Sequence, residues 1–366
     1  MKIIFAGGGT GGHVAPAVAL AEEINRRDGI NEILFVGRAG GNENKMIKNA
    51  GFDLEELRIY GIERRLTGRN IKNLIAALKA MSRSKQIIKD FAPDAIVGTG
   101  GYVCWPIIKA GQKLNIPTYI HESNVFPGLA TKSLSAKCRR VFLGHEKTAE
   151  YLPKTVATKT TGNPIRKDFS TISRSYARAK LGLREKNVFI VSFGGSGGSA
   201  LLNDHLISLM RNFSAKNDKI VHIHATGAKY YEKYKSEIKN IRDAGCKILP
   251  YIDDMPLYLK AADIVICRCG AMTLSEIASA SCASILIPSP NVTNDHQRKN
   301  GELLASANAA IMIEEKDLTE ESLASALKRL YKNPQERQKL SKCIEKFAIC
   351  DAQKTIINDI FSDISR

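Results

Sequence analysis

Two glycine-rich stretches are the segments of this sequence best suited to chemistry. Gly8-Gly9-Thr10-Gly11-Gly12 and Gly194-Gly195-Ser196-Gly197-Gly198 lie 186 residues apart (194 − 8), and each stands between an apolar, strand-like run and a helical pattern. Glycines let the backbone approach a phosphate closely, and the helix that follows offers free N–H groups and a partial positive charge. We therefore expect both stretches to be phosphate-binding loops.

His13 follows the first loop directly, which places an imidazole at the start of the next helix. The positive end of a helix disfavours the imidazolium ion and so favours the neutral form that a general base needs. A histidine that only caps or packs the loop would have the same position. Sequence spacing leaves these two interpretations open.

The first loop also matches the dinucleotide fingerprint, because Gly7, Gly9 and Gly12 have the required spacing. Binding of NAD further needs a carboxylate at the end of the second strand, whereas the run Ile33–Val36 is followed by no acidic residue before Arg38. Arg38 would suit the extra phosphate of NADP. A nicotinamide enzyme therefore stays only as a minor alternative.

Three further polar groups follow strand-like runs, at the strand ends where open α/β sheets collect their ligands. They are His121-Glu122-Ser123-Asn124, Ala271–Glu276 and Asp295-His296-Gln297. Thr273 and Glu276 have the spacing of a capping box, in which Glu276 only satisfies a backbone N–H. In the alternative interpretation, Glu276 accepts two hydrogen bonds from a ribose diol.

A metal site is not expected from the histidines and cysteines. His222 and His224 share one face of a strand, but no third ligand accompanies them, and we interpret both as packing residues. None of the eight cysteines forms a C-x-x-C pair, and Cys267 and Cys269 sit at a strand end where small buried residues are common. Dispersed cysteines without a secretory signal favour a reducing cytosol.

The elements that must position these residues alternate along both halves of the chain. Apolar runs of strand length recur at Lys2–Ala6, Ile33–Val36, Leu54–Ile59, Asp94–Val97, Thr118–His121, Arg140–Leu143, Val188–Phe193, Ile220–Ala225, Cys246–Leu249, Ala262–Cys267 and Ala283–Ile287. Helical patterns lie between them, including Pro16–Asn25, Ile71–Lys89, Leu201–Asn212, Tyr230–Ile241 and Leu274–Ala280. Such alternation is typical of parallel sheets covered by helices on both faces.

We therefore predict an α/β fold with two Rossmann-like, doubly wound parallel-sheet domains that face a central cleft. The turn-rich stretch Thr160–Pro164 is the candidate boundary between them. Near the C-terminus, Ile356, Ile357, Ile360 and Phe361 have the spacing of an amphipathic helix.

Length and composition agree with this organisation. A chain of 366 residues suits two domains, and 44% hydrophobic with 25% charged residues excludes a disordered or fibrous protein. The net charge of +17 favours polyanions, phosphorylated small molecules or an anionic membrane surface as partners. No apolar run is long enough for a transmembrane helix, and the apolar start is too short for a signal peptide.

Part of the positive charge gathers between Arg64 and Lys89, where the helix Ile71–Lys89 also carries an apolar stripe. The stripe consists of Ile71, Leu74, Ile75, Leu78 and Met81. Cations beside an apolar stripe suit docking to an anionic bilayer, although such a stripe more often packs on a sheet. Nucleic acid is not an expected partner, because no aromatic residues are interleaved for base stacking.

Taken in order, the motifs resemble the MurG-type members of glycosyltransferase family 28. The motifs that carry the resemblance are Gly8–His13, Gly98–Tyr102, His121–Asn124, Gly162–Arg166, Gly194–Gly198, Tyr251–Met255, Cys267–Glu276 and Asp295–Gln297. They cover nearly the whole chain at family-like spacing. The resemblance implies transfer of N-acetylglucosamine (GlcNAc) from UDP-GlcNAc to the MurNAc 4-hydroxyl of undecaprenyl-pyrophosphoryl-MurNAc-pentapeptide (lipid I), with inversion, to form the peptidoglycan precursor lipid II.

The same resemblance implies a GT-B fold and a division of labour between domains. Residues 1–164 together with a C-terminal helix at 348–366 would form the acceptor and membrane-side domain, and 165–347 would bind UDP-GlcNAc. The enzyme would work as a peripheral protein on the cytoplasmic face of the bacterial plasma membrane, docked through the Ile71–Lys89 helix. Other cell-wall synthesis proteins are further partners that the resemblance allows.

Site residues follow from the matching motifs. Arg166 and Ser196 would lie near the phosphates and sugar, the backbone of Ile252 would meet uracil, Glu276 would take the ribose hydroxyls and Gln297 the donor sugar. Ribose and diphosphate would be held by Ala271, Met272, Thr273, Leu274 and Ser275. The first domain would contribute Thr10, Gly11, Gly12 and Asn124, with the first loop suited to the acceptor's pyrophosphate.

His13 is the expected general base, with Glu122 as the second candidate. No cofactor or metal is expected, because UDP-GlcNAc is a substrate and no Asp-x-Asp motif is present. Two departures from the family pattern stand out. In the second loop, Gly197 stands where the family often has a glutamine. The stretch from Asp295 aligns ambiguously by one residue, so His296 could take the place of Gln297 as the residue that contacts the donor sugar. The alternative function is another GT-B transferase, or a UDP-sugar epimerase, that acts on a soluble substrate.

Overall fold

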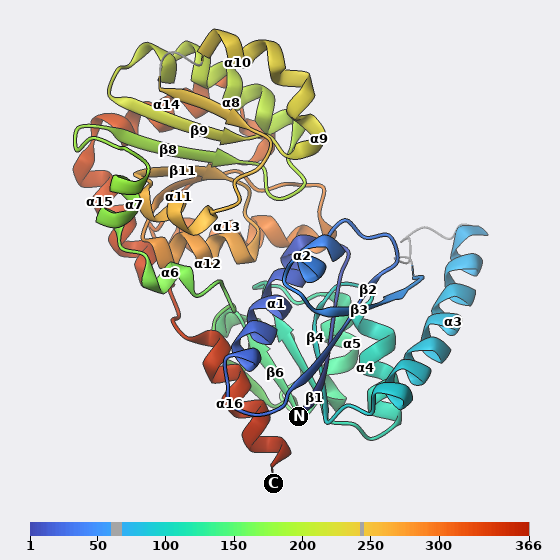
Figure 1. The fold of residues 1–366 in the computed structure, drawn as a ribbon. Coiled ribbons are helices and arrows are strands. Elements are labelled where there is room, and N and C mark those ends of the chain that lie inside the picture. Colours follow the sequence, from blue (N-terminus) through green and yellow to red (C-terminus); the bar gives the residue numbers. More distant parts are fainter. Residues whose placement is uncertain (60–67, 242–244, 366) are drawn as a thin grey trace. The chain divides into compact units, whose positions relative to one another are not determined.

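The computed structural model describes residues 1–59, 68–241 and 245–365, and their side chains except at 68–75 and 238–240. Within this range the chain folds into two compact units, each visible in Figure 1. Unit 1 comprises Met1–Ile165 and Asp351–Arg366, and unit 2 comprises Arg166–Cys350. Each unit holds one parallel sheet, as the alternating pattern predicts.

Unit 1 contains a seven-stranded sheet of order β3-β2-β1-β4-β5-β6-β7. Its strands are β1 (Lys2–Gly7), β2 (Glu32–Arg38), β3 (Asp53–Leu57), β4 (Ala95–Gly100), β5 (Thr118–Glu122), β6 (Arg140–Leu143) and β7 (Thr158–Thr160). Its helices are α1 (Gly11–Asn25), α2 (Asn44–Asn49), α3 (Gly68–Phe91), α4 (Cys104–Lys113), α5 (Leu129–Leu134) and α16 (Ala352–Ile364). Since β1 pairs with both β2 and β4, the strand order reverses at β1, where doubly wound sheets bind ligands.

Alternate residues of β1 pack on opposite faces of this sheet. Ile4 and Ala6 belong to a core cluster that includes residues of α3 and α4. Ile3 and Phe5 belong to a second cluster, which includes α1 and the fully buried isoleucines 356, 357 and 360 of α16. Figure 1 shows α16 beside α1, and the two helices are in contact. The predicted amphipathic stripe near the C-terminus is therefore confirmed, and it packs on the first sheet.

Unit 2 contains a six-stranded sheet of order β10-β9-β8-β11-β12-β13. Its strands are β8 (Val188–Phe193), β9 (Ile220–Ala225), β10 (Cys246–Leu249), β11 (Ile264–Cys267), β12 (Ala283–Leu286) and β13 (Ile311–Met312). Its helices are α6 (Asp168–Thr171), α7 (Arg174–Lys180), α8 (Ala200–Asn212), α9 (Ala228–Tyr231), α10 (Lys235–Ile241), α11 (Met255–Ala261), α12 (Ala271–Ala280), α13 (His296–Ser306), α14 (Glu320–Lys332) and α15 (Pro334–Glu345). As in unit 1, the strand order reverses at the first strand, β8.

Four elements differ from the sequence-based prediction. The edge strands β7 and β13 have no predicted counterpart, since β7 is short and exposed and β13 has only two residues. The helix predicted at Tyr230–Ile241 is divided into α9, a 3-10 turn (Glu232–Tyr234) and α10. Helix α1 begins at Gly11 and contains Pro16, which the prediction had placed at the helix start.

Candidate active site

The first glycine-rich loop connects β1 to α1 and presents the start of that helix. Gly9 has a φ of 90°, a conformation that favours glycine, and Thr10 is the extended N-cap residue of α1. The first turn of α1 holds no acidic residue. The N–H groups of Gly11 and Gly12, the first two residues of the helix, are therefore suited to an anion.

His13 lies in the first turn of α1, as predicted, and its ring is held by the loop itself. Its Nδ1 lies 3.1 Å from the carbonyl oxygen of Gly8 and 3.3 Å from the hydroxyl oxygen of Thr10. Because a carbonyl oxygen can only accept, the Gly8 contact places the proton on Nδ1 and leaves Nε2 as the basic nitrogen of the neutral ring. The two interpretations of His13, packing the loop and acting as a base, are thus compatible.

Glycines of the β4–α4 connection make room for the His13 ring. A Cβ on Gly100 would lie 2.6 Å from His13 Cδ2, and one on Gly101 would lie 1.9 Å from the Gly8 carbonyl oxygen. Thr99 donates a hydrogen bond of 2.7 Å to the backbone carbonyl of His13. The motif Gly98–Tyr102 therefore supports the first loop.

Sequence reasoning missed Glu43, the N-cap residue of α2. Its side chain is 6% exposed and accepts a hydrogen bond of 2.6 Å from the N–H of Gly9. The Arg38 Nε atom lies 3.7 Å from the same carboxylate oxygen. Arg38, whose charge suggested an NADP phosphate, thus faces a protein carboxylate. No local pattern signals this contact, because Glu43 and Gly9 are 34 residues apart in the chain.

Glu122, the second candidate base, is a hydrogen-bonding centre of unit 1. Its oxygens accept from the backbone N–H groups of Asn124 (3.1 Å) and Gly128 (2.9 Å) and from the Thr131 hydroxyl (2.6 Å). The Asn124 side-chain amide donates a further bond of 3.1 Å. Four donors on one carboxylate favour a role in holding the Asn124 loop in place over proton transfer.

The second loop connects β8 to α8 and is the more open of the two. Ser196 and Gly197 are exposed, and a Cβ on Gly195 or Gly197 would meet no atom within 4 Å. At Gly198 a Cβ would lie 2.1 Å from the carbonyl oxygen of Thr226, so this end of the loop packs tightly. The loop thus has free space on its Ser196 side.

The start of α12 overturns one interpretation of Glu276. The helix begins at Ala271 with Gly270 as N-cap, so Thr273 lies inside the helix and the capping box does not form. Glu276 is half-buried, and burial raises the pKa of its carboxyl to about 7, against the opposing effect of the Arg166 guanidinium. A half-buried carboxyl with no capping role fits the ribose interpretation.

Arg166 and the segment that starts at Tyr251 lie in the same region of unit 2. The Arg166 guanidinium donates a hydrogen bond of 3.3 Å to the backbone carbonyl of Asp253. Tyr251 is 46% exposed, and burial raises the pKa of its hydroxyl while Arg166 lowers it and Glu276 raises it. The structure therefore brings Arg166, Glu276 and the neighbours of the buried Ile252 into one region of unit 2.

Gln297 and His296 open α13 and both are anchored by their loop. Gln297 accepts a hydrogen bond of 2.9 Å from the N–H of Ser289 through Oε1. His296 Nδ1 lies 2.9 Å from the carbonyl oxygen of Thr293. Asn294 and Asp295, directly before them, have φ values of 57° and 53°, so the turn into α13 is strained.

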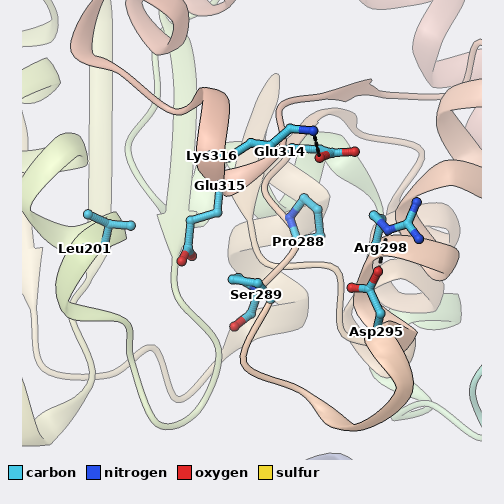
Figure 2. Close-up of a pocket in the computed structure, with 9 residues that line it drawn as sticks. Leu201, Pro288, Ser289, Asp295, Arg298, Glu314, Glu315 and Lys316 are labelled. Carbon is cyan, nitrogen blue, oxygen red and sulfur yellow. Dashed lines mark hydrogen bonds and ion pairs between the residues drawn. The ribbon is translucent and has the colours of Figure 1, made fainter.

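A cavity of about 440 Å³ lies beside this loop in unit 2. Its lining includes Leu201, Ser289 and Glu315, and none of the predicted donor-binding residues (Figure 2). Its charged groups are paired with one another or with Arg268: Arg298 with Asp295, Lys316 with Glu314, and the buried Arg268 with Glu315 at 2.5 Å. We assign no ligand to this cavity.

His222 and His224 belong to a buried network. The hydroxyl of Ser192 lies 2.8 Å from His222 Nε2 and 2.9 Å from His224 Nδ1. Ser214 contacts the other nitrogen of His222, and Asn203 that of His224. Burial lowers the pKa of His222 to about 3 and that of His224 to about 4, so both rings are neutral and serve as packing residues, as predicted.

Among the side chains of α3 that the structure describes, those on one side of the helix pack on the first sheet. Ala80, Ile87 and Ile88 are buried in the core, whereas Leu78 is 65% exposed. Four cations, Lys79, Arg83, Lys85 and Lys89, are also exposed. Of the other stripe residues, Met81 is half-buried. The side chains of Ile71, Leu74 and Ile75 lie outside the described part of the structure. Across the described residues, none of the helices is long and apolar enough to cross a bilayer.

Comparison with known proteins decides the family. Residues 3–143 match the glycosyltransferase family 28 N-terminal domain, and residues 189–356 match its C-terminal domain. The chain is 39% identical over 359 residues to a Thermoanaerobacter sp. (strain X514) protein, covering 97% of this chain and 98% of the relative. This chain belongs to glycosyltransferase family 28. The relative is named UDP-N-acetylglucosamine--N-acetylmuramyl-(pentapeptide) pyrophosphoryl-undecaprenol N-acetylglucosamine transferase.

Solved structures agree with the family and its GT-B fold. The crystal structure of Acinetobacter baumannii MurG superposes with a TM-score of 0.76 at 25% identity and covers 99% of both chains. A UDP-GlcNAc 2-epimerase from Neisseria meningitidis gives a TM-score of 0.69 over 99% of this chain, but at 12% identity. The epimerase likeness shows a shared fold alone. The predicted GT-B fold and the resemblance to the family are therefore confirmed.

Proposed function

We propose that this family 28 protein transfers GlcNAc from UDP-GlcNAc to the MurNAc 4-hydroxyl of lipid I and so forms lipid II. The observation that carries this proposal is the match along the whole chain to relatives named for that reaction, at 39% identity for one of them. The same match speaks against the two alternatives, a transferase with a soluble acceptor and an epimerase.

Unit 2 is the proposed donor site. The N–H groups at the start of α12 and the Arg166 guanidinium would stabilise the diphosphate as the UDP leaves, since preorganised donors act strongly on a developing charge. Glu276 would accept the ribose hydroxyls, the backbone of Ile252 would meet uracil, and Gln297 would donate to the sugar. Ser196, on the open side of the second loop, would reach the phosphates.

Unit 1 is the proposed acceptor site. The N–H groups of Gly11 and Gly12 and the Thr10 hydroxyl suit the acceptor's pyrophosphate, with Asn124 beyond the end of β5, which β4 separates from β1 in the same sheet. His13 Nε2 would take the proton of the MurNAc 4-hydroxyl as that oxygen attacks the anomeric carbon of the donor. One displacement on an α-linked donor gives a β-1,4 bond with inversion.

The deciding experiment is a transfer assay with labelled UDP-GlcNAc and a lipid I analogue. We expect a lipid II analogue to form, with UDP-GalNAc as a poor donor. His13→Ala should lower kcat by ~10²–10⁴ and leave the Kd for UDP-GlcNAc nearly unchanged, because the base acts only during transfer. Absence of transfer by the native chain would refute the function, whereas near-native turnover of His13→Ala would refute only the base.

We further propose that α3 docks the enzyme peripherally on the cytoplasmic face of an anionic membrane. Leu78 is 65% exposed beside the exposed Lys79, which is the combination that interfacial helices use. Leu78→Glu should weaken sedimentation with vesicles of phosphatidylglycerol and phosphatidylcholine, and salt should weaken it further. Ile30→Glu, at an exposed apolar residue outside α3, is the matched control. Equal sedimentation of both variants would contradict docking through α3.

A further inference from the structure

The peptide bond between Gly8 and Gly9 connects a buried carboxylate to the proposed base. Its N–H, on Gly9, donates a bond of 2.6 Å to Glu43. Its carbonyl oxygen, on Gly8, lies 3.1 Å from His13 Nδ1. One rigid, planar group is therefore hydrogen-bonded at one end to a carboxylate and at the other to an imidazole.

We propose that Glu43 is a positioning residue that orients His13 through this peptide. A carboxylate that accepts the Gly9 N–H polarises the peptide and strengthens its carbonyl as an acceptor, because hydrogen bonds in a chain reinforce one another. The stronger acceptor holds the His13 proton on Nδ1, and Nε2 remains basic and fixed in direction. This inference rests on the proposed function, in which His13 takes the acceptor's proton.

The surroundings of Glu43 suit this role. The side chain is 6% exposed, and its charge is balanced by the Arg38 guanidinium, whose Nε lies 3.7 Å away. Its bond to Gly9 also removes that N–H from the set that could bind a phosphate. Anion binding is thereby left to the N–H groups of Gly11 and Gly12, while the Gly8–Gly9 peptide serves His13.

Steric contacts fix the peptide from its other sides. A Cβ on Gly9 would lie 3.2 Å from the Tyr102 ring, and one on Gly101 would lie 1.9 Å from the Gly8 carbonyl oxygen. The Gly8 N–H faces the carbonyl oxygen of Gly100 at 3.4 Å. Loss of the Glu43 bond should therefore leave the loop folded, so that Glu43→Ala and Glu43→Gln are tolerable substitutions, while in Glu43→Ala the peptide loses the bond that holds its carbonyl oxygen on His13 Nδ1.

The test combines a spectroscopic readout with kinetics. In the free enzyme labelled with ¹⁵N-histidine, the His13 resonances, assigned by their loss in His13→Ala, should report the Nδ1–H form. Glu43→Ala should convert a substantial share of His13 to the other tautomer. Glu43→Ala should also lower kcat by ~10–100-fold with little change in the KM for UDP-GlcNAc, as is typical when a supporting hydrogen bond is lost.

Glu43→Gln separates charge from shape, because its amide oxygen still accepts the Gly9 N–H. It should keep the tautomer and move the acidic limb of the kcat profile to lower pH, since the lost negative charge no longer favours the imidazolium. Glu23→Gln, at a buried acid of α1 that pairs with Arg26, is the control and should change neither readout. An unchanged tautomer together with native kcat in Glu43→Ala would overturn the inference.

The outcomes distinguish this inference from the proposed function. If the native chain forms no lipid II, the function fails, although the tautomer of His13 still reports the Glu43 linkage. If the native chain is active and His13→Ala is inactive while Glu43→Ala behaves as native, only the positioning role fails.

Discussion

Glu276 makes the pH dependence of donor binding a direct test of the proposed site. Burial raises the pKa of its carboxyl from 4.5 to about 7. Only the ionised carboxylate accepts both hydroxyls of a ribose diol without offering a proton of its own. At about pH 5.5 only ~3% of a group with this pKa is ionised, so UDP-GlcNAc should bind roughly 30-fold more weakly there than at about pH 8.5.

The stability of the ligand-free enzyme should respond in the opposite sense. Between pH 4.5 and about 7 the native state keeps a proton on Glu276 that the unfolded state has released, so the free energy of unfolding falls as the pH rises. At 1.36 kcal/mol per pH unit the loss is at most about 3 kcal/mol, complete above pH 7. Glu276→Gln is neutral at every pH and should therefore show neither the binding trend nor this loss.

Isothermal titration calorimetry with UDP-GlcNAc from about pH 5.5 to 8.5 measures the binding trend. The diphosphate of this ligand is esterified at both ends and does not titrate in the range, unlike that of free UDP. Glu336→Gln, at an acid of unit 2 that pairs with Arg329 outside the proposed site, is the matched control and should keep the native trend. A native affinity that is constant over this range, or an equal trend in Glu276→Gln, would refute the reasoning.

Three further predictions follow from individual contacts. Gly101→Ala places a Cβ 1.9 Å from the Gly8 carbonyl oxygen at a φ of 80°, so the first loop must move and kcat should fall ~10²-fold in the transfer assay. Arg268→Met leaves the carboxylate of Glu315 without its partner and should lower the free energy of unfolding by ~3–5 kcal/mol in urea titrations, while the double variant with Glu315→Leu should regain much of it. Because His222 has a pKa of about 3 in the folded chain, stability should fall as pH decreases below 6.5, and less steeply in His222→Gln.

The sheets could be predicted because parallel strands buried on both faces are continuous apolar runs. In β1 and β8, five of the six residues are buried, so their pattern is unambiguous. The edge strand β7 (Thr158–Thr160) is exposed along its whole length and pairs on one side only. Because its residues are polar, the sequence has no apolar run at this position. The segment is a strand only because it pairs with β6.

The positions of candidate site residues could be predicted where a single segment carries them, and not where two segments meet. The position of His13 follows from the glycines before it, and that of Glu276 from the strand before its helix. The capping box was wrong because Gly270, not Thr273, is the N-cap residue of α12, and both assignments fit the local residue types. Glu43 was missed because its partner is brought to it by the β1–β2 pairing and not by sequence proximity.

Two loops of similar sequence thus have different chemistry because of what surrounds them. Around Gly195 and Gly197 there is open space, and an exposed loop with free donors suits a charged diphosphate that must enter and leave. In the first loop, the N–H of Gly9 is hydrogen-bonded to the buried Glu43 carboxylate, and the carbonyl oxygen of Gly8 lies against the His13 imidazole. Part of the backbone of this loop is therefore already paired with protein groups. A phosphate would be repelled by Glu43 at that point and, in the proposed site, accepted two to three residues later, at Gly11 and Gly12. The proposed division of this loop between anion binding and orientation of a base depends on Glu43, which the glycine pattern alone does not reveal.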